Sequence, residues 1–527
     1  MATPNELLAA SLGVLRDLQK DGRRVFQSKD ITRVHRERLV QQGFVQEVIK
    51  GWLISSSPGT AKGDSTPWYA SFWEFCARYC DSRFGDQWHL SPEQSILLLA
   101  ENTTIPRQVI VYSPNGANNT INLLFDTSLY DLKARMPARE DLVQRDGLKL
   151  FSVGAALVRV PEQFFSRYPI EVRVVLASVK DASEVLTQLL QEGRSVVAGR
   201  LAGAFRRIER PEIADEIIST MKSAGYSIRE SDPFAAPQKF GALVPSVPPI
   251  VNRLHAMWEN SRKKIIDNFP KAPGLPTDRA GYLGFVDDIY KSDAYHSLSI
   301  EGYSVTPELI ERVRLGSWKP DSDATDAETR NALAARGYWQ AFQRVKESVT
   351  EVIQGKPSGE AIRAGHRDWY RELFQPCVAA GIIPATALAG YRRHPVFLRG
   401  SRYVPPRWDI VPDAMSALFD LIANEPEAGV RAVLGHWLLG FIHPYPDGNG
   451  RMARFLMNVA LASGGYPWTV IRVEDREEYL RALDLASIDG DVVPFSKYVA
   501  SRVRWSETQS EKETQTTRAN AGRYSAS

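Results

Sequence analysis

One short segment, His443-Pro-Tyr-Pro-Asp-Gly-Asn-Gly-Arg451, constrains the fold and chemistry of this 527-residue chain more than any other. An apolar stretch, residues 433–442, precedes it, and residues 452–461 follow it before the sequence Ser463-Gly464-Gly465. The apolar stretch predicts a buried helix, and the glycines after the second stretch are typical of a helix end. The segment is therefore predicted to form a tight loop that joins two helices and begins the second one.

The residue types of this loop suit nucleotide chemistry. Gly448 and Gly450 let the backbone approach a ligand closely, and N–H groups at the start of a helix can bind an anion. Arg451 and Arg454 are three residues apart, so they share one helix face and can hold phosphate oxygens. Asp447 carries the hard oxygen ligand that Mg²⁺ prefers.

An imidazole stands at the start of the loop. The ordinary pKa of a histidine lies near the working pH, which predicts that His443 acts as a general base. The alternative is an ordinary Asp-Gly-Asn-Gly turn beside a chance histidine. The histidine, the helix-opening position and the two arginines together argue against that alternative.

The segment from His443 to Arg454 resembles the signature of the Fic (Fido) family of protein adenylyltransferases, although Tyr445 stands where the family usually has Phe. The resemblance implies that His443 deprotonates a target hydroxyl, that Asp447 holds Mg²⁺ and that Arg454 reaches the γ-phosphate of ATP. AMP would then pass from ATP to a Ser, Thr or Tyr hydroxyl of a target protein, and pyrophosphate would leave. The resemblance also implies that the nucleotide phosphates are bound by Gly448, Asn449, Gly450 and Arg451.

A second motif lies upstream of the first. Ser297-Leu-Ser-Ile-Glu301-Gly302 resembles the inhibitory motif of autoregulated Fic proteins. The resemblance implies a carboxylate that pairs with Arg454 and so prevents this guanidinium from orienting the γ-phosphate. The alternative is an exposed helical pair of Ser297 and Glu301, with Gly302 as the helix C-cap.

Two further segments resemble parts of the same family. Strand-like runs at Val396, Phe397 and Leu398 and at residues 402–404 flank Gly400, which predicts a hairpin. It resembles the Fic flap, which aligns a target segment by adding it as a strand; an ordinary surface hairpin is the alternative. Tyr479 lies in a stretch that resembles the helix closing the adenine side of the nucleotide pocket, and a core aromatic is an equal alternative.

The composition predicts a cytoplasmic protein without a membrane segment. A hydrophobic content of 43% is ordinary for globular chains, and three cysteines fit a reducing compartment. The chain begins without the design of a signal peptide and has no apolar run of membrane-spanning length. It has no Walker-type phosphate loop and too few cysteines for a four-thiolate zinc site. His436 lies among apolar residues and is predicted to be a core histidine.

The sequence predicts a multidomain chain with a winged-helix-like segment at 1–60 and an α/β domain at 61–231. A linker rich in Pro and Ala follows at 232–249, then an all-α Fic domain at 250–505 that carries the β-hairpin flap, and a disordered polar tail at 506–527. Within the α/β domain, residues 108–112 and 120–125 are predicted strands. Residues 161–168, 182–192 and 213–225 are predicted helices.

The first 60 residues have the order helix, basic helix and two strands turning at Lys50-Gly51, which is the order of a winged helix. Arg33, Arg36 and Arg38 of the basic helix could contact DNA, whereas a solvated face in a protein-contact domain is an equal alternative. The N-terminal half also resembles, in its order of elements, AbiEi-type antitoxins and transcriptional regulators, which implies DNA binding or autoregulation. The net charge of +3 is too small to decide this.

Two functional classes follow from these features. The first is an autoinhibited protein adenylyltransferase that uses ATP, requires Mg²⁺ and modifies a partner protein at a hydroxyl side chain. The second is a DNA-binding regulator or antitoxin-like protein whose Fic domain is accessory. Within the first class, another nucleotide donor or the removal of AMP stays open, because the motif binds phosphates and the surrounding pocket selects the donor. A homo-oligomer also stays open.

Overall fold

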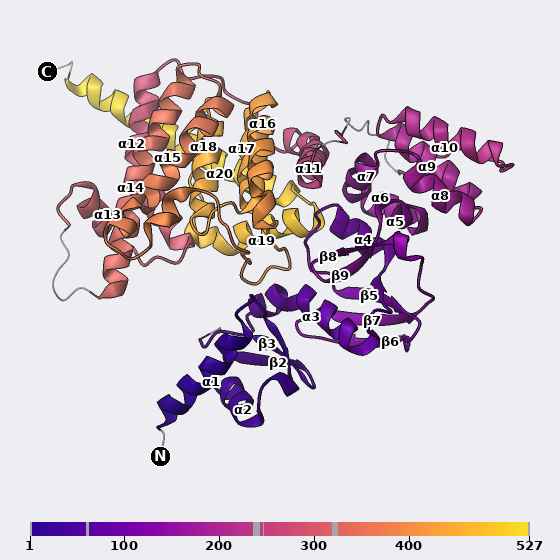
Figure 1. The fold of residues 1–527 in the computed structure, drawn as a ribbon. Helices are drawn as coiled ribbons and strands as arrows, with labels where there is room; N and C mark the ends of the chain where they lie inside the picture. Colours follow the sequence, from indigo (N-terminus) through magenta and orange to yellow (C-terminus); the bar gives the residue numbers. More distant parts are fainter. Residues whose placement is uncertain (1–2, 60–62, 235–242, 246, 319–324, 525–527) are drawn as a thin grey trace. The chain divides into compact units, whose positions relative to one another are not determined.

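The computed structural model describes residues 3–59, 63–234, 243–245, 247–318 and 325–524. It divides into two compact units, each drawn in Figure 1. The first comprises Met1–Ala256 and Phe397–Val404, and the second comprises Met257–Val396 and Pro405–Ser527. None of the described helices is both long and apolar enough to cross a membrane.

The first unit begins with two helices and a three-stranded antiparallel sheet of order β1-β3-β2. The basic helix and the hairpin that turns at Lys50-Gly51 are present, as the sequence predicted. A small apolar core that includes Leu15, Phe26 and Leu39 holds the helices against the sheet. The elements are α1 (Pro4–Leu18), β1 (Val25–Gln27), α2 (Arg33–Gln41), β2 (Val45–Ile49) and β3 (Trp52–Ser55).

The three arginines of α2 all bond to acceptors inside this unit. Arg38 ties α2 to α1, whereas Arg33 stays 81% exposed. The acceptors are Glu37 for Arg33 (2.7 Å), the Ser28 carbonyl for Arg36 (3.1 Å) and Ser11 Oγ for Arg38 (2.8 Å).

The predicted α/β region follows. Its sheet has the order β4-β5-β7-β6, in which β5 pairs parallel with β7 and the other pairs are antiparallel. The strands and helices predicted between residues 108 and 225 are all present, with small shifts at their ends. The elements are α3 (Thr66–Phe84), β4 (His89–Leu90), α4 (Pro92–Leu99), β5 (Gln108–Ser113), β6 (Asn119–Asn122), β7 (Ser128–Lys133), β8 (Leu142–Arg145), β9 (Leu148–Phe151), α5 (Val153–Arg159), α6 (Glu162–Arg167), α7 (Pro169–Ser178), α8 (Ser183–Gln191), α9 (Ser195–Arg207) and α10 (Pro211–Ser223).

The predicted β-hairpin around Gly400 is wrong as a hairpin. A turn forms at residues 399–400, but no strand is assigned at 396–398 or 402–404. The reason is that backbone acceptors of this segment bond elsewhere in the first unit. The Arg402 carbonyl accepts from the Ile105 N–H (2.8 Å), and the Val404 carbonyl accepts from Thr103 Oγ1. These groups are therefore unavailable for a ladder across the turn.

The described residues of the second unit form helices and connecting loops without a strand, as the all-α prediction required. Helix α14 packs against α15, and α17 packs against α18 (Figure 1). The α-helices are α11 (Pro249–Ile266, shared with the first unit), α12 (Arg279–Ile300), α13 (Pro307–Arg314), α14 (Asp326–Ile353), α15 (Ser358–Ala379), α16 (Val411–Asn424), α17 (Ala428–Ile442), α18 (Asn449–Ala462), α19 (Arg476–Asp489) and α20 (Val493–Tyr524).

Two predicted boundaries differ or stay undescribed. Most of the predicted linker, residues 235–242 and 246, lies outside the described residues. The predicted disordered tail is instead helical as far as Tyr524, because α20 continues through it. The tail contains Glu, Gln and Ala, which favour helix, and α20 is anchored at its start by buried Phe495 and Val499.

Candidate active site

The loop from His443 to Gly448 joins α17 to α18, as predicted. His443 is the C-cap of α17 in the left-handed conformation (φ 51°), and Gly448 is the N-cap of α18 with φ 81°. A left-handed conformation is unfavourable for a histidine, so the surroundings must hold it. Buried Arg392 does so: its Nε donates to the His443 carbonyl (2.8 Å), and its backbone N–H donates to the Pro444 carbonyl (2.8 Å).

His443 is arranged to act as a base. Its Nδ1 lies 3.3 Å from the Gly440 carbonyl, which can only accept, so Nδ1 carries the hydrogen and Nε2 keeps its lone pair. Burial lowers the pKa of His443 to about 4, although the Gly440 hydrogen bond and the charges of Glu301 and Asp447 oppose the shift. The imidazole is therefore neutral near pH 7 and can accept a proton.

Asn449 holds the shape of the loop. Its side-chain oxygen accepts from the Tyr445 N–H (2.9 Å), and its side-chain nitrogen donates to the Tyr445 carbonyl (2.8 Å). The side chain is buried, and both of its polar atoms take part in this exchange. Any contact of Asn449 with a phosphate would therefore come from its backbone N–H, which lies among the first amides of α18.

Both glycines of the loop occur where a side chain would not fit. A Cβ atom on Gly448 would lie 2.8 Å from the Phe374 ring, and one on Gly450 would collide with the Glu301 carboxylate. The carboxylate thus lies directly against the backbone that begins α18. This is the position where the sequence predicted that an anion would bind.

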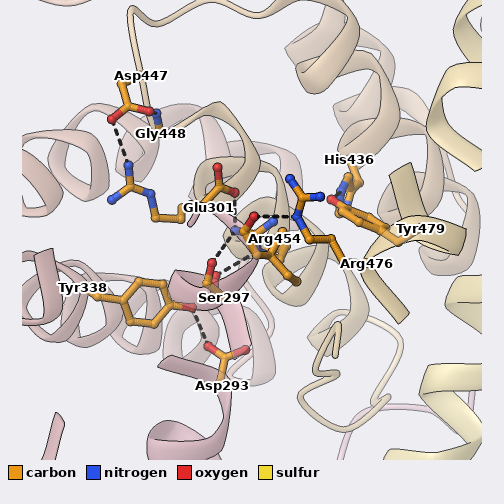
Figure 2. A network of polar contacts seen from close by, with 12 residues as sticks. Asp293, Ser297, Glu301, Tyr338, His436, Asp447, Gly448, Arg454, Arg476 and Tyr479 are labelled. Carbon is orange, nitrogen blue, oxygen red and sulfur yellow. Dashed lines mark hydrogen bonds and ion pairs between the residues drawn. The ribbon is translucent and has the colours of Figure 1, made fainter. Parts of the chain in front are cut away.

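Arg454 is the centre of the polar network in Figure 2. Its Nη2 donates to Glu301 Oε1 (2.6 Å), and its Nε donates to Ser297 Oγ (2.8 Å). Both acceptors belong to the predicted inhibitory motif at the end of α12. Burial alone would raise the pKa of Glu301, but the Arg454 and Arg451 guanidiniums outweigh burial and lower it. The carboxyl is therefore ionised, and the pair with Arg454 is a charged one.

Arg451 is buried between two aromatic rings. Its guanidinium lies 5.3 Å from the Tyr303 ring centre and 5.1 Å from that of Phe374, and its Nη2 lies 3.3 Å from Asp447 Oδ2. Among the described residues, Arg451 Nε and Arg454 Nη1 are buried donors without a hydrogen-bond partner. Buried unused donors are costly, and a bound anion would satisfy them.

A cavity of about 440 Å³ is lined by residues of both the loop and the upstream motif that contains Glu301. Its lining includes Glu301, Tyr303, Arg330 and Asp447. The Asp447 side chain is 58% exposed, so its carboxylate is accessible. Across the described part of the chain, no group of three or more His, Cys, Asp or Glu residues could hold a metal. A cation at Asp447 would therefore need further ligands from a bound phosphate.

Tyr479 lies in the core beside Arg454. Only 2% of it is exposed, and its hydroxyl hydrogen bonds with His436 Nε2 (2.7 Å; Figure 2). His436 is also buried, and burial lowers its pKa to about 3, in keeping with the predicted core histidine. Its contacts match the core-aromatic alternative for Tyr479.

Part of the predicted flap belongs to the other unit, and some residues of the site were missed by the sequence analysis. Phe397 and Leu398 of the predicted flap belong to the first unit, where the Arg24 guanidinium lies 4.8 Å from the Phe397 ring. Arg392, which holds the loop, had no sequence signal beyond being a basic residue near a turn. The buried pair in which Tyr338 donates to Asp293 (2.6 Å; Figure 2) also had no signal in the sequence.

Comparison with known proteins identifies the domain around this loop. Residues 358–461, from α15 to the end of α18, match the model of the Fic/DOC family. The chain therefore contains a Fic domain. The Protein adenylyltransferase Fic of Nematostella vectensis is 41% identical over 242 residues, which cover 44% of this chain and 49% of that protein. A probable protein adenylyltransferase of Aquifex aeolicus is 34% identical over 221 residues, covering 41% and 61%.

The similarity is partial in length. The solved structure of Fic-1 from C. elegans is 16% identical, covers 69% of this chain and 92% of that one, and superposes with a TM-score of 0.38. The chain spans about half the length of the Nematostella vectensis relative. What these relatives do as whole proteins is therefore a basis for proposals about this chain.

The first prediction concerns the protonation of His443. Its ¹⁵N shifts should stay those of a neutral imidazole with hydrogen on Nδ1 between about pH 7.5 and 5.5, because its pKa lies near 4. Histidine-labelled protein, with the His443→Gln variant to assign the signal, provides the measurement. Protonation with a midpoint near the ordinary value of about 6.5 would contradict the buried, neutral base.

Proposed function

We propose that this chain is a protein adenylyltransferase that transfers AMP from ATP to a hydroxyl side chain of another protein, and that Glu301 holds it inactive. The observation that carries the proposal is the loop from His443 to Arg454, in which a neutral imidazole precedes a helix start with unused arginine donors. The names of the relatives support AMP transfer, and the contacts of Arg454 support the inhibition.

The chemistry requires a base and an anion site. His443 Nε2 takes the proton of the target hydroxyl, whose oxygen attacks the α-phosphorus of ATP. The bond between the α-phosphorus and the oxygen that bridges to the β-phosphorus breaks, and pyrophosphate leaves. The first amides of α18 and the donors of Arg451 and Arg454 stabilise the phosphate charges.

Magnesium fits this site through one residue. Asp447 offers an exposed carboxylate in the cavity that adjoins the anion site, and Mg²⁺ usually binds through one or two carboxylates together with substrate phosphates. When bound, the ion would supply charge neutralisation between the phosphates. Asp447 would hold it, and the Gly448 N–H that donates to Asp447 Oδ1 (2.6 Å) would orient the carboxylate.

The proposed inhibition follows from competition for one guanidinium. Glu301 bonds to Arg454 and lies where a phosphate would meet the backbone at Gly450. A nucleotide whose γ-phosphate binds Arg454 must displace this carboxylate, because two anions cannot share the position. Inhibition is therefore built into the chain and is set by the strength of one partly buried ion pair.

The second prediction is that His443→Ala abolishes AMP transfer. Loss of the base should lower the rate on the order of 10²–10⁴-fold. The measurement is the incorporation of labelled AMP into lysate proteins and into the chain itself, in the Glu301→Gly background. His436→Gln is unsuitable as a control because His436 lies in the core; exposed His255 on α11 offers His255→Gln as a matched control. Equal labelling by the His443 variant and its parent would remove His443 from this role.

The third prediction is that removing the Glu301 charge raises activity. We expect Glu301→Gly to label on the order of 10²-fold faster than the parent, because it frees one phosphate donor. Glu301→Gln keeps the shape but not the charge and should fall between the two. Glu347→Gln, at a side chain 63% exposed on α14, is the matched control and should label like the parent. If all four proteins labelled at one rate across ATP concentrations, the inhibitory role would be refuted.

DNA binding is a second candidate function, carried by the first unit. The order β1-β3-β2 with α1 and α2 favours it, and so does the 81% exposure of Arg33. The internal bonds of Arg36 and Arg38 weaken it, because these side chains already support the fold. Arg33 is therefore the side chain of α2 whose substitution tests DNA contact without disturbing the unit.

The fourth prediction uses the full chain and a labelled random-sequence duplex. If α2 contacts DNA, anisotropy titrations should show binding that weakens with salt, and Arg33→Ala should lower the salt slope by about 1. Exposed Arg16 on α1 provides Arg16→Ala as the control of equal charge. No binding at low salt would leave protein contact as the role of this face.

A further inference from the structure

A second cavity borders the catalytic loop on residues that the AMP-transfer reaction does not use. It has a volume of about 1080 Å³ and lies within the second unit. Its lining comes from α15, from the segment 383–394 and from residues 408–412, and it reaches the loop at Tyr445 and Pro446. The nucleotide-side cavity meets the same loop at Asp447 instead. The two cavities therefore share no lining residue and meet neighbouring residues of one loop.

The second cavity is cationic. Arg367 and Arg371 lie four residues apart on α15 and share a face, and Arg393 reaches the cavity from the segment 383–394. The two aspartates of the lining are already paired, Asp368 with Arg371 and Asp409 with Arg407 (2.8 Å). Neither Arg367 nor Arg393 has a carboxylate partner among the described residues, and both are exposed.

Aromatic side chains complete the wall. Trp408 is 44% exposed, and Tyr391 bonds through its hydroxyl to His366 Nε2 (3.2 Å). Tyr445 stacks on Tyr370 with ring centres 4.0 Å apart. Among the described residues, its buried hydroxyl has no hydrogen-bond partner, although the Arg367 charge acts on it. A buried hydroxyl without a partner indicates that a polar group is missing from this wall.

We propose that this cavity binds an acidic segment of the protein substrate, close to the hydroxyl that His443 deprotonates. The occupant is named on the basis of the proposed function; the anion preference rests on the lining alone. Exposed arginines beside aromatic rings are typical of peptide recognition, in which aromatics anchor and arginines select the charge. The unused Tyr445 hydroxyl offers a donor to a peptide carbonyl or carboxylate.

The position of the cavity favours a peptide over a free nucleotide. In an in-line displacement the attacking hydroxyl and the leaving pyrophosphate lie on opposite sides of the reacting phosphorus. The cavity that meets the loop at Tyr445 and Pro446 is distinct from the one lined by Asp447 and Glu301. The cavity at Tyr445 and Pro446 suits the acceptor, and the cavity at Asp447 and Glu301 suits the nucleotide.

The test is a binding titration on the full chain without nucleotide, so its result does not depend on AMP transfer. The probes are three fluorescein-labelled peptides of equal length that alternate Ser with Glu, Gln or Lys. We expect the Glu peptide to bind, the Gln peptide to bind at least about tenfold more weakly, and the difference to shrink as salt screens the charges. Equal binding of the Glu and Gln peptides would overturn the proposal.

Variants locate the binding. The double substitution Arg367→Ala and Arg393→Ala should weaken the Glu peptide roughly tenfold, and Tyr445→Phe should weaken it severalfold while leaving the ring in place. Arg336→Ala, at an exposed arginine of α14 outside the lining, is the matched control. Melting curves establish that each variant is folded. Unchanged binding in the folded double variant would refute the site.

A charge reversal keeps the test decisive. Arg367→Glu with Arg393→Glu should shift the preference from the Glu peptide to the Lys peptide, a gain that misfolding cannot produce. A labelled single-stranded oligonucleotide serves as a rival anion. If it binds more tightly than the Glu peptide and is lost in the same variants, the cavity recognises nucleic acid and the peptide proposal is wrong.

Discussion

The contacts of Arg454 are the constraint on which the rest of the second unit depends. A guanidinium with 3% exposure cannot remain without acceptors, and α12 supplies them through Ser297 and Glu301. The same bonds hold the end of α12 against α18, so the fold and the proposed inhibition use one interaction. A phosphate that replaced the Glu301 carboxylate would preserve the charge balance of the buried arginine, which is why such an exchange is physically reasonable.

The loop from His443 to Gly448 is held from both sides by groups that do not react in the proposed mechanism. Arg392 bonds to the carbonyl of left-handed His443, and Asn449 bonds to both backbone groups of Tyr445. These contacts fix the backbone conformation of the loop before any ligand binds, so the loop needs little reorganisation for the proposed reaction. Burial then keeps the imidazole neutral, at the expense of its basicity. The low pKa is consistent with a base that must be unprotonated whenever a hydroxyl enters.

Local sequence predicted the parts of the site that depend on neighbours in the chain. The two-helix loop and the shared face of Arg451 and Arg454 follow from spacing and turn chemistry. Arg392 and Tyr338 were missed because their partners lie far away in sequence. The prediction of a hairpin around Gly400 was wrong for the same reason. Residues 396–398 and 402–404 have the composition of strands, but Thr103 and Ile105 donate to the carbonyls of Val404 and Arg402. The helical end of α20 shows that a polar composition does not exclude helix when the helix is anchored upstream.

The proposed functions of the two cavities are linked through the loop between them. Tyr445 lines the acceptor-side cavity, and its backbone is bound by Asn449, which begins the helix that carries Arg451 and Arg454. A peptide that bound the Tyr445 hydroxyl would therefore load the same loop that presents amides to the nucleotide. Coupling between the two cavities needs no long pathway, because a single residue, Pro446, separates Tyr445 in the lining of one cavity from Asp447 in the lining of the other. If the loop is as rigid as its bonds indicate, acceptor binding would position the hydroxyl without displacing Glu301, and relief of inhibition would have to come from the nucleotide side.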